Sequence, residues 1–107
     1  MRRETIDGAG LGRRLAAGDG SGFVVLFVAG WCGFCRQLRA ELDGAAGTGL
    51  PLVEVDISDE QDPAWDEWRV ELVPTAVLFR DGREAGRRTP SLHGLPLGEV
   101  LELVGPG

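Results

Sequence analysis

The sequence predicts an α/β fold with a mixed central sheet and helices on both of its faces. A continuous apolar run at 23–28 is typical of a strand buried on both faces, as in a parallel sheet. An amphipathic helical pattern follows it and leads to a second apolar strand. Further on, an Asp-Gly turn joins two strand-like segments into a hairpin. Because a β-α-β unit has parallel strands and a hairpin has antiparallel ones, the two together give a mixed sheet.

The first elements alternate between helix and strand. Leu11 and Leu15 lie at helical spacing between glycines and indicate a short first helix before the strand at 23–28. A second helix ends near Gly44, and its apolar residues recur at i, i+3 and i+7. These residues are Cys35, Leu38 and Leu42. The run from Leu50 to Ile57 is predicted to form the next strand.

The remaining elements are marked by proline, aspartate and glycine. Asp62 is expected to cap a third helix, with Pro63 as its first residue. The hairpin is predicted over 75–80 and 83–88, joined by Asp81-Gly82. Pro96 is expected to open the last helix. The apolar face of that helix is predicted to consist of Leu97, Val100, Leu101 and Val104.

Length and charge limit the possible functions. The 107 residues are expected to form a single domain over 1–107, large enough for a core without structural disulfides or metals. The net charge is −6 and all 11 basic residues are arginine, without an extended basic patch. Such a chain is repelled by phosphate backbones, so no nucleic-acid partner is expected. The polar N-terminus lacks the apolar core of a signal peptide, and the longest apolar run, 23–29, is too short to span a membrane. If the sequence is the full gene product, a cytoplasmic protein without membrane contact is expected.

The two cysteines of the chain carry the predicted chemistry. Cys32 and Cys35 lie where the buried strand ends and the amphipathic helix begins. Unpaired N–H groups and the helix dipole place partial positive charge there, which stabilises a thiolate. Because the thiolate is the nucleophile in disulfide exchange, Cys32 is expected to attack. A spacing of two residues on a helical turn brings the sulfur of Cys35 within bonding reach of it.

A lone CxxC also has plainer explanations. It can be half of a zinc site or a structural disulfide. Zinc needs three or four protein ligands, and the only other soft ligand in the sequence is His93, in an expected loop. A structural disulfide is disfavoured in a reducing cytosol. The strand–CxxC–helix context therefore favours redox chemistry and no bound metal.

Three segments carry a resemblance to a known family. The run Val-Ala-Gly-Trp-Cys-Gly-Phe-Cys at 28–35 resembles the active-site segment of thioredoxins. Val-Pro-Thr at 73–75 is similar to their cis-proline loop, and the strand end at 79–82 also fits the pattern. With the order of elements, the resemblance covers nearly the whole chain. It implies a thioredoxin-like fold, with Cys32 as the attacking thiol, Cys35 as the resolving thiol and no bound cofactor.

The resemblance also implies a substrate-binding set. Trp31 would shield the site and border the substrate groove, and Gly33 would let a substrate backbone come close. Pro74 would follow a cis peptide bond, face the cysteines and occupy space that a metal could fill. The backbone of Val73 would pair with an extended substrate strand. Taken without the CxxC, 73–75 would be a plain loop proline before an edge strand.

The chain departs from the thioredoxin pattern at several positions. Leu26 stands where thioredoxins commonly carry a buried Asp, and Glu54 where they commonly carry a Lys. Glu54 either faces solvent or lies under the cysteines, where it would be a candidate proton acceptor for Cys35. Phe34 replaces the usual proline, which argues against a strongly oxidising protein and makes Phe34 a candidate substrate contact.

Trp65 and Trp68 lie about one turn apart, so they are expected to pack the third helix rather than to bind a partner. The expected activity is reduction of disulfide-containing protein substrates in the cytosol by a monomer. A reductase or a low-molecular-weight thiol would recycle it. Two alternatives stay open. One is a glutaredoxin-like or isomerase-like exchange coupled to glutathione. The other is a scaffold or metal-binding module without catalysis.

Overall fold

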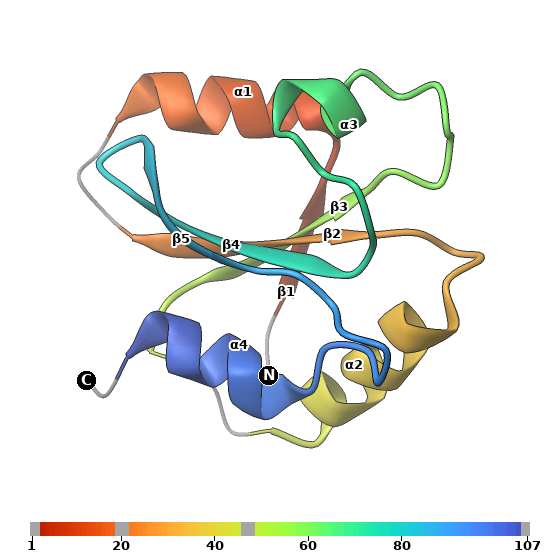
Figure 1. Cartoon of the computed structure of the whole chain (residues 1–107). Helices are drawn as coiled ribbons and strands as arrows, with labels where there is room; N and C mark the ends of the chain where they lie inside the picture. The colour runs from red at the N-terminus through yellow and green to blue at the C-terminus, as the bar shows by residue number, and fades with distance from the viewer. Residues whose placement is uncertain (1–2, 19–21, 46–48, 106–107) are drawn as a thin grey trace.

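The computed structural model describes residues 3–18, 22–45 and 49–105. A five-stranded sheet in the order β1-β3-β2-β4-β5 forms its centre. Figure 1 shows α1 and α3 on one face of this sheet and α2 and α4 on the other. The predicted fold class, a mixed sheet with helices on both faces, is confirmed.

The elements have the following bounds in chain order. The strands are β1 (Arg3–Ile6), β2 (Phe23–Val28), β3 (Leu52–Asp56), β4 (Thr75–Arg80) and β5 (Arg83–Arg88). The helices are α1 (Gly8–Ala17), α2 (Gly33–Asp43), α3 (Ala64–Glu67) and α4 (Leu97–Val104). Within the described ranges, no helix has both the length and the apolar character that crossing a bilayer requires.

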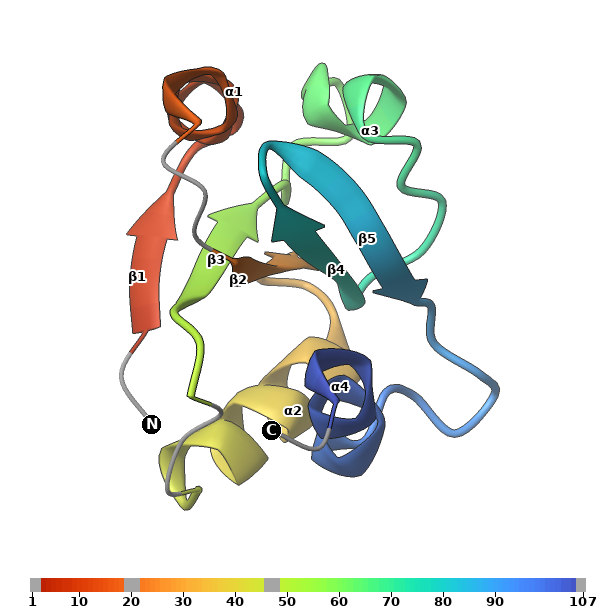
Figure 2. The same ribbon diagram turned by 90° about the vertical axis from the view of Figure 1, so that its left-hand side faces the viewer.

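Strand β2 lies at the centre of the sheet and positions the cysteine segment. It pairs in parallel with β3 and antiparallel with β4, and all six of its residues are buried. The β2-α2-β3 segment is the predicted parallel unit. Figure 2 shows β1 at one edge of the sheet and β5 at the other. Because β2 has a strand on each side and helices on both faces, its uninterrupted apolar sequence is what this position requires.

The β4–β5 hairpin has the predicted bounds. Its two turn residues, Asp81 and Gly82, have φ angles of 54° and 75°. Two positive φ angles in succession are typical of a type I′ turn, whose twist matches that of the flanking strands. Asp and Gly tolerate this conformation, so the local sequence specifies the hairpin.

Strand β3 is shorter at both ends than the predicted run from Leu50 to Ile57. Two further elements differ from the prediction. Strand β1 was not predicted, because an edge strand of four residues with exposed Glu4 and Thr5 leaves no apolar run. The third helix begins one residue later than expected: Pro63 occupies the capping position and Ala64 is the first helical residue. Asp62 still satisfies the helix start, because its Oδ1 accepts a hydrogen bond from the backbone N of Ala64 at 2.9 Å.

The buried face of α4 is rotated from the predicted one. Val100 and Leu103 are buried, whereas Leu101 is 39% exposed, so the prediction that Leu101 faces the core was wrong. The reason lies in β5, where Gly86 has no side chain. A Cβ on Gly86 would lie 2.8 Å from Cδ1 of Leu103. Leu103 therefore packs into the space that this glycine leaves, and Leu101 turns outward.

Candidate active site

The cysteine pair lies at the carboxyl end of β2, where the chain enters α2. Cys32 occupies the capping position before the helix, and its extended backbone (φ −92°, ψ 115°) is typical of that position. The backbone N of Cys35 donates a hydrogen bond to Sγ of Cys32 at 3.1 Å. Sγ of Cys32 therefore takes the place of a capping oxygen, in contact with the positive end of the helix.

The two thiols differ in exposure. Cys32 is 7% exposed, whereas Cys35 is fully buried under the helix. Both are free thiols in this structure. Sγ of Cys32 donates a hydrogen bond to the carbonyl oxygen of Val73 at 3.4 Å. The arrangement provides one cysteine with slight access to solvent and a second that is fully sheltered.

Burial changes the acidity of the inner thiol. Burial raises the pKa of Cys35 from 9.0 to about 12, and the hydrogen bond and negative charge of Cys32 act in the same direction. A hydrogen bond to the backbone of Ala29 and the positive charge of Arg39 act in the opposite direction. In the reduced protein, Cys35 is therefore protonated at neutral pH.

The segment before β4 forms the other side of the site. The peptide bond between Val73 and Pro74 is cis, and both residues are buried. The hydroxyl of Thr75 donates to the carbonyl oxygen of Leu72 at 2.6 Å, which closes the turn before the strand. The structure thus brings residues 72–75 against Cys32, although about forty positions separate them in sequence.

A loop after β3 supports the residues that precede Cys32. The backbone N of Gly30 donates a hydrogen bond to Oγ of Ser58, with 2.7 Å between the two atoms. The indole N–H of Trp31 donates to the carbonyl oxygen of Ser58 at 2.8 Å, and its ring stacks on Trp65. Sequence reasoning missed Ser58 and assigned Trp65 only to helix packing. The available signal was the position of Ser58 just after a parallel strand, at the same sheet edge as the cysteines.

The two residues between the cysteines face outward. A Cβ on Gly33 would meet nothing nearer than the Arg36 side chain, at 3.7 Å, so no internal contact requires glycine at this position. Phe34 is 41% exposed, and its ring lies against Gly94. A Cβ on Gly94 would be only 2.7 Å from Cδ1 of Phe34. The phenyl ring therefore joins the CxxC turn to the loop before α4.

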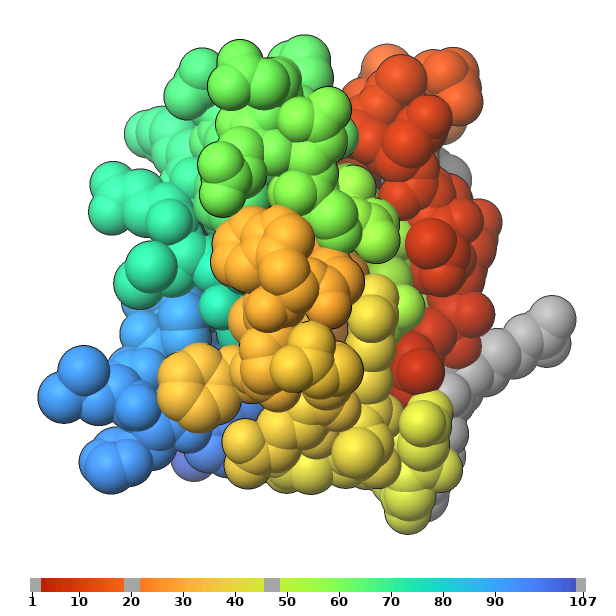
Figure 3. Space-filling model, turned by 90° about the vertical axis from the view of Figure 1, so that its right-hand side faces the viewer, coloured from red at the N-terminus to blue at the C-terminus, as the bar shows by residue number. Residues whose placement is uncertain are grey.

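Exposed apolar side chains gather around this site. Among the described residues, the large hydrophobic side chains that are exposed are Trp31, Phe34, Leu72, Leu92 and Leu101. The first four belong to the cysteine segment, the segment before Pro74 and the 91–94 loop. In Figure 3 these three segments lie side by side on one face, in orange, turquoise and blue. We call the four residues the apolar rim of the site.

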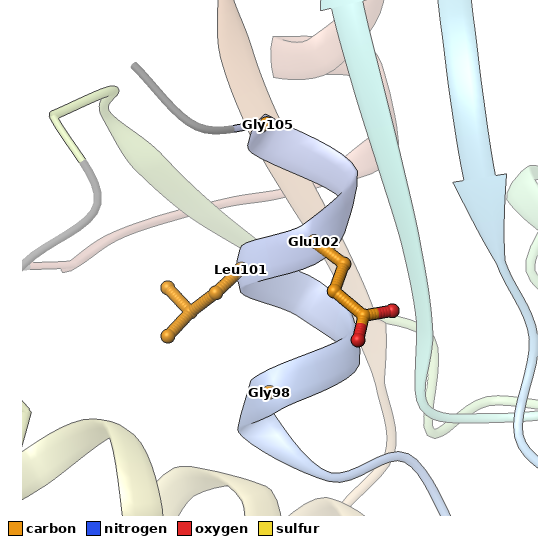
Figure 4. A pocket seen from close by; sticks show the side chains of 4 residues that line it. All are labelled: Gly98, Leu101, Glu102 and Gly105. Carbon is orange, nitrogen blue, oxygen red and sulfur yellow. The ribbon is translucent and has the colours of Figure 1, made fainter.

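Other surface features lie apart from the cysteines. An open hollow of about 420 Å³ is lined by the α4 residues Gly98, Leu101 and Glu102 and by Gly105 (Figure 4). None of these belongs to the CxxC segment or to 72–75. In the part of the chain that the structure describes, no three His, Cys, Asp or Glu side chains are grouped as a metal site would need.

Comparison with known proteins identifies the family. The thioredoxin family profile matches residues 13–94, most of the chain. The chain belongs to the thioredoxin family. It is 41% identical over 66 residues to thioredoxin H2-1 of Oryza sativa, covering 60% of this chain but only 47% of the rice protein. It is 39% identical over 71 residues to the thioredoxin of Chlamydia trachomatis, covering 63% of this chain and 68% of that one.

Solved thioredoxins share the whole fold. The crystal structure of thioredoxin f2 from Chlamydomonas reinhardtii superposes with a TM-score of 0.81 over 96% of this chain and 94% of that one. The two sequences are 20% identical, so this likeness concerns the fold. The thioredoxin family reduces protein disulfides, and this member keeps the paired cysteines of a thiol–disulfide oxidoreductase.

The chain departs from the common thioredoxin sequence at Glu54, a residue of β3 that pairs with α2. Glu54 is 6% exposed, so it faces the interior rather than solvent. Its Oε1 accepts a hydrogen bond from Nε of Arg39 at 3.1 Å and lies 3.4 Å from Nε of Arg3. Within the described ranges, no hydrogen bond joins Glu54 to Cys35. Proton transfer between these two residues stays a prediction.

Proposed function

We propose that this chain reduces disulfide bonds in protein substrates, with Cys32 as the attacking thiol and Cys35 as the resolving thiol. The observation that carries the proposal is the position of Cys32. Its Sγ accepts a hydrogen bond from the first turn of α2 and donates one to the carbonyl of Val73, and the residue keeps 7% exposure. Cys35 lies directly behind it and is fully buried. Exchange through two thiols needs this difference in access.

The reaction has two steps. The thiolate of Cys32 attacks one sulfur of the substrate disulfide, forming a mixed disulfide and releasing the other substrate sulfur as a thiolate, which takes up a proton. Cys35 then loses its proton and attacks Sγ of Cys32. The Cys32–Cys35 disulfide forms, the bond to the substrate breaks and its electron pair leaves with the second substrate sulfur. The substrate gains two electrons and two protons, and the chain is oxidised.

The apolar rim and its neighbours form the proposed substrate surface. Trp31 and Phe34 flank the cysteines with exposed apolar area. Gly33 has no side chain to block a substrate backbone. Pro74 directly follows Val73, whose carbonyl contacts Cys32. The backbone of Val73 is proposed to pair with an extended substrate segment once Cys32 is engaged. Unfolded or extended segments with a large apolar residue beside the cystine fit this surface best.

The oxidised chain needs an electron donor. A fold neighbour, with a TM-score of 0.70 and 16% identity, is a thioredoxin f2 solved in a complex with ferredoxin:thioredoxin reductase. A reductase is therefore one proposed partner of this chain, and a low-molecular-weight thiol is the other. We further propose that the protein acts as a monomer in the cytosol, where reducing conditions keep both thiols free.

The first test measures disulfide reduction with a chemical electron donor. The rate of reduction of a disulfide-bonded protein such as insulin is measured with excess dithiothreitol, for the wild-type chain and for Cys32→Ser. The wild-type chain should accelerate the reaction catalytically, and Cys32→Ser should abolish the acceleration. A folded wild-type chain that adds nothing to the rate of dithiothreitol alone contradicts the proposal and favours a non-catalytic scaffold.

The choice of donor separates the proposal from its main alternative. Dithiothreitol is replaced in parallel by glutathione with glutathione reductase, or by a thioredoxin reductase with its nicotinamide cofactor. Turnover with the thioredoxin reductase supports the thioredoxin activity. Turnover with glutathione alone favours the glutaredoxin-like or isomerase-like activity.

A further inference from the structure

A chain of four charged side chains links the sheet to α2, and its outer member, Asp43, is exposed. Arg3 of β1 contacts Asp43 of α2 at 2.8 Å and Glu54 of β3 at 3.4 Å. Glu54 in turn pairs with Arg39 of α2 at 3.1 Å. The carboxylate of Glu54 is thus held between two guanidinium groups from two different elements. The mechanism described above uses none of the four.

Of the four charged residues, Arg39 is the one nearest in sequence to the resolving cysteine, Cys35. It follows Cys35 by four residues in α2, and residues at this spacing occupy the same helix face. The buried thiol and the Arg39 side chain both face the sheet, where Glu54 anchors the guanidinium. Glu54 pairs in register with Leu26 of β2, so these two side chains share one face of the sheet.

The strand that thioredoxins commonly use to supply a carboxylate is apolar here. Leu26 is fully buried, as is Ala76, its partner in β4. The charged or titratable groups that act on Cys35 are Cys32 and Arg39, both from the segment that contains it. Strand β3 adds Glu54, through its pair with Arg39, and Asp56, on which Arg39 also acts. Helix α4, which packs against α2, carries the acidic residues Glu99 and Glu102, and in the described residues neither is ion-paired with α2.

We propose that Arg39 is the cation that stabilises the Cys35 thiolate as it resolves the mixed disulfide, and that Glu54 is a positioning residue that holds Arg39 in place. The inference rests on the proposed two-cysteine exchange. It assigns Glu54 a role different from the proton acceptor that the sequence suggested. In this chain a half-buried cation would favour the ionised thiol, whereas a buried carboxylate would take its proton.

The resolving step shows why such a charge matters. Cys35 must give up its proton before its sulfur attacks Sγ of Cys32, and burial opposes this ionisation. A positive charge beside the sulfur lowers the free energy of the anion and speeds the attack. The released substrate thiolate takes up a proton, so the step consumes none overall.

The first test is a titration of the Cys35 thiol. In the Cys32→Ser background Cys35 is the single cysteine, and the chain contains no tyrosine whose ionisation would overlap the thiolate absorbance. Adding Arg39→Met should raise the pKa of Cys35, while Arg39→Lys should keep it close to the starting value. Arg36→Met removes the same charge from the exposed side of the same helix and serves as the control. An unchanged pKa in Arg39→Met overturns the proposal.

The second test separates the two roles of Glu54 by kinetics. Both cysteines are kept, and the aromatic disulfide dithio-bis(nitrobenzoate) reports attack by Cys32 in a first phase and resolution by Cys35 in a second. Arg39→Met should slow the second phase about three- to tenfold at neutral pH and shift its pH profile upward, leaving the first phase unchanged. Glu54→Gln, which still accepts a hydrogen bond from Arg39, should not slow the second phase. Slowing in Glu54→Gln without the rise in the Cys35 pKa expected for Arg39→Met shows that the carboxylate takes the proton and overturns the proposal.

A second variant keeps the proposal testable if Arg39→Met does not fold, and the tests are independent of the proposed reduction of proteins. If Arg39→Met does not fold, the paired variant Arg39→Met/Glu54→Gln leaves no unpaired carboxylate, and it should slow the second phase as well, though less. Neither test uses a protein substrate. A chain that shows both phases but does not reduce insulin contradicts the proposed function without touching the role of Arg39.

Discussion

The indole rings of Trp31 and Trp65 stack with their centroids 6.5 Å apart and their planes 6° from parallel. Both indole N–H groups donate to backbone carbonyls of the loop after β3: Trp31 to Ser58, and Trp65 to Ile57 and Asp59. Trp31 is therefore fixed on its inner side although it is 55% exposed. A rigid aromatic side chain beside Cys32 loses little conformational freedom when a substrate binds.

Trp65→Leu should weaken substrate binding while leaving the cysteine chemistry intact. Without the stack, Trp31 samples more orientations, so KM for a protein disulfide should rise about two- to tenfold, which corresponds to ~0.5–1.5 kcal/mol for an aromatic pair. The rate with a small aliphatic disulfide should not change. Trp68→Phe is the matched control, because Trp68 packs on Phe27 and not on Trp31. Equal losses with both substrates would show that Trp65 has only a structural role.

Ser58→Ala should destabilise the loop that carries Trp31. Its hydroxyl accepts from Gly30 and donates to Asp56. The hydroxyl bond to Asp56, together with the bond from the backbone N–H of Ser58, holds the pKa of Asp56 below its usual value. The variant should raise that pKa and lose about 1 kcal/mol of stability at neutral pH. The lowered pKa of Asp56 stabilises the folded protein fully only above the pKa that Asp56 has in the unfolded chain. Part of the stability difference between the wild type and Ser58→Ala should therefore vanish below about pH 4. Carboxyl NMR titration measures the pKa, and urea unfolding at two pH values measures the stability; an unchanged Asp56 pKa contradicts the assignment.

Gly94→Ala should be strongly destabilising for two separable reasons. Gly94 has φ of +86°, and an added Cβ would lie 2.7 Å from the Phe34 ring. We expect a loss of about 1–3 kcal/mol in urea unfolding. In a Phe34→Ala background the ring is gone, and the same substitution should cost only the backbone component. If the two costs are equal, the contact between Phe34 and Gly94 contributes nothing.

The reduced protein should lose stability in strongly alkaline solution. The pKa of Cys35 is raised from 9.0 to about 12. Because the folded state keeps this proton longer than the unfolded chain, its stabilising effect is complete below pH 9 and is lost as pH rises toward 12. The chain contains no tyrosine or lysine that would titrate in this range. Urea unfolding should show a decrease of no more than about 4 kcal/mol, and a much flatter profile for Cys35→Ser. Equal slopes for the two proteins contradict the burial of a protonated Cys35.

Local sequence signals predicted much of the fold. The apolar run of β2 and the Asp81-Gly82 turn each specify their element through a few adjacent residues, and both have the predicted bounds. Strand β1 carries no such signal, because it forms only by pairing with β3, more than forty residues away. The face of α4 also depended on a distant residue, Gly86, whose missing side chain admits Leu103.

In the site, too, features encoded by adjacent residues could be predicted, whereas contacts between separate elements could not. The cysteine pair was evident because strand, CxxC and helix are contiguous in sequence. The sequence could not decide whether the Glu54 side chain faces solvent or the interior, because a strand buried on both faces shows no alternation of polar and apolar residues. Its ion pair with Arg39 and the stacking of Trp65 on Trp31 join separate elements, so neither followed from local pattern.

The central claim is that Cys32 attacks and Cys35 resolves. Its most direct test is to mix each single-cysteine variant with a disulfide-bonded protein and to analyse the products by non-reducing mass spectrometry. Cys35→Ser should accumulate a covalent complex linked through Cys32, because the attack proceeds and the resolving thiol is absent. Cys32→Ser should accumulate almost none, because Cys35 is buried and protonated. A complex formed equally well by Cys32→Ser, or by neither variant when both are folded, would contradict the assignment.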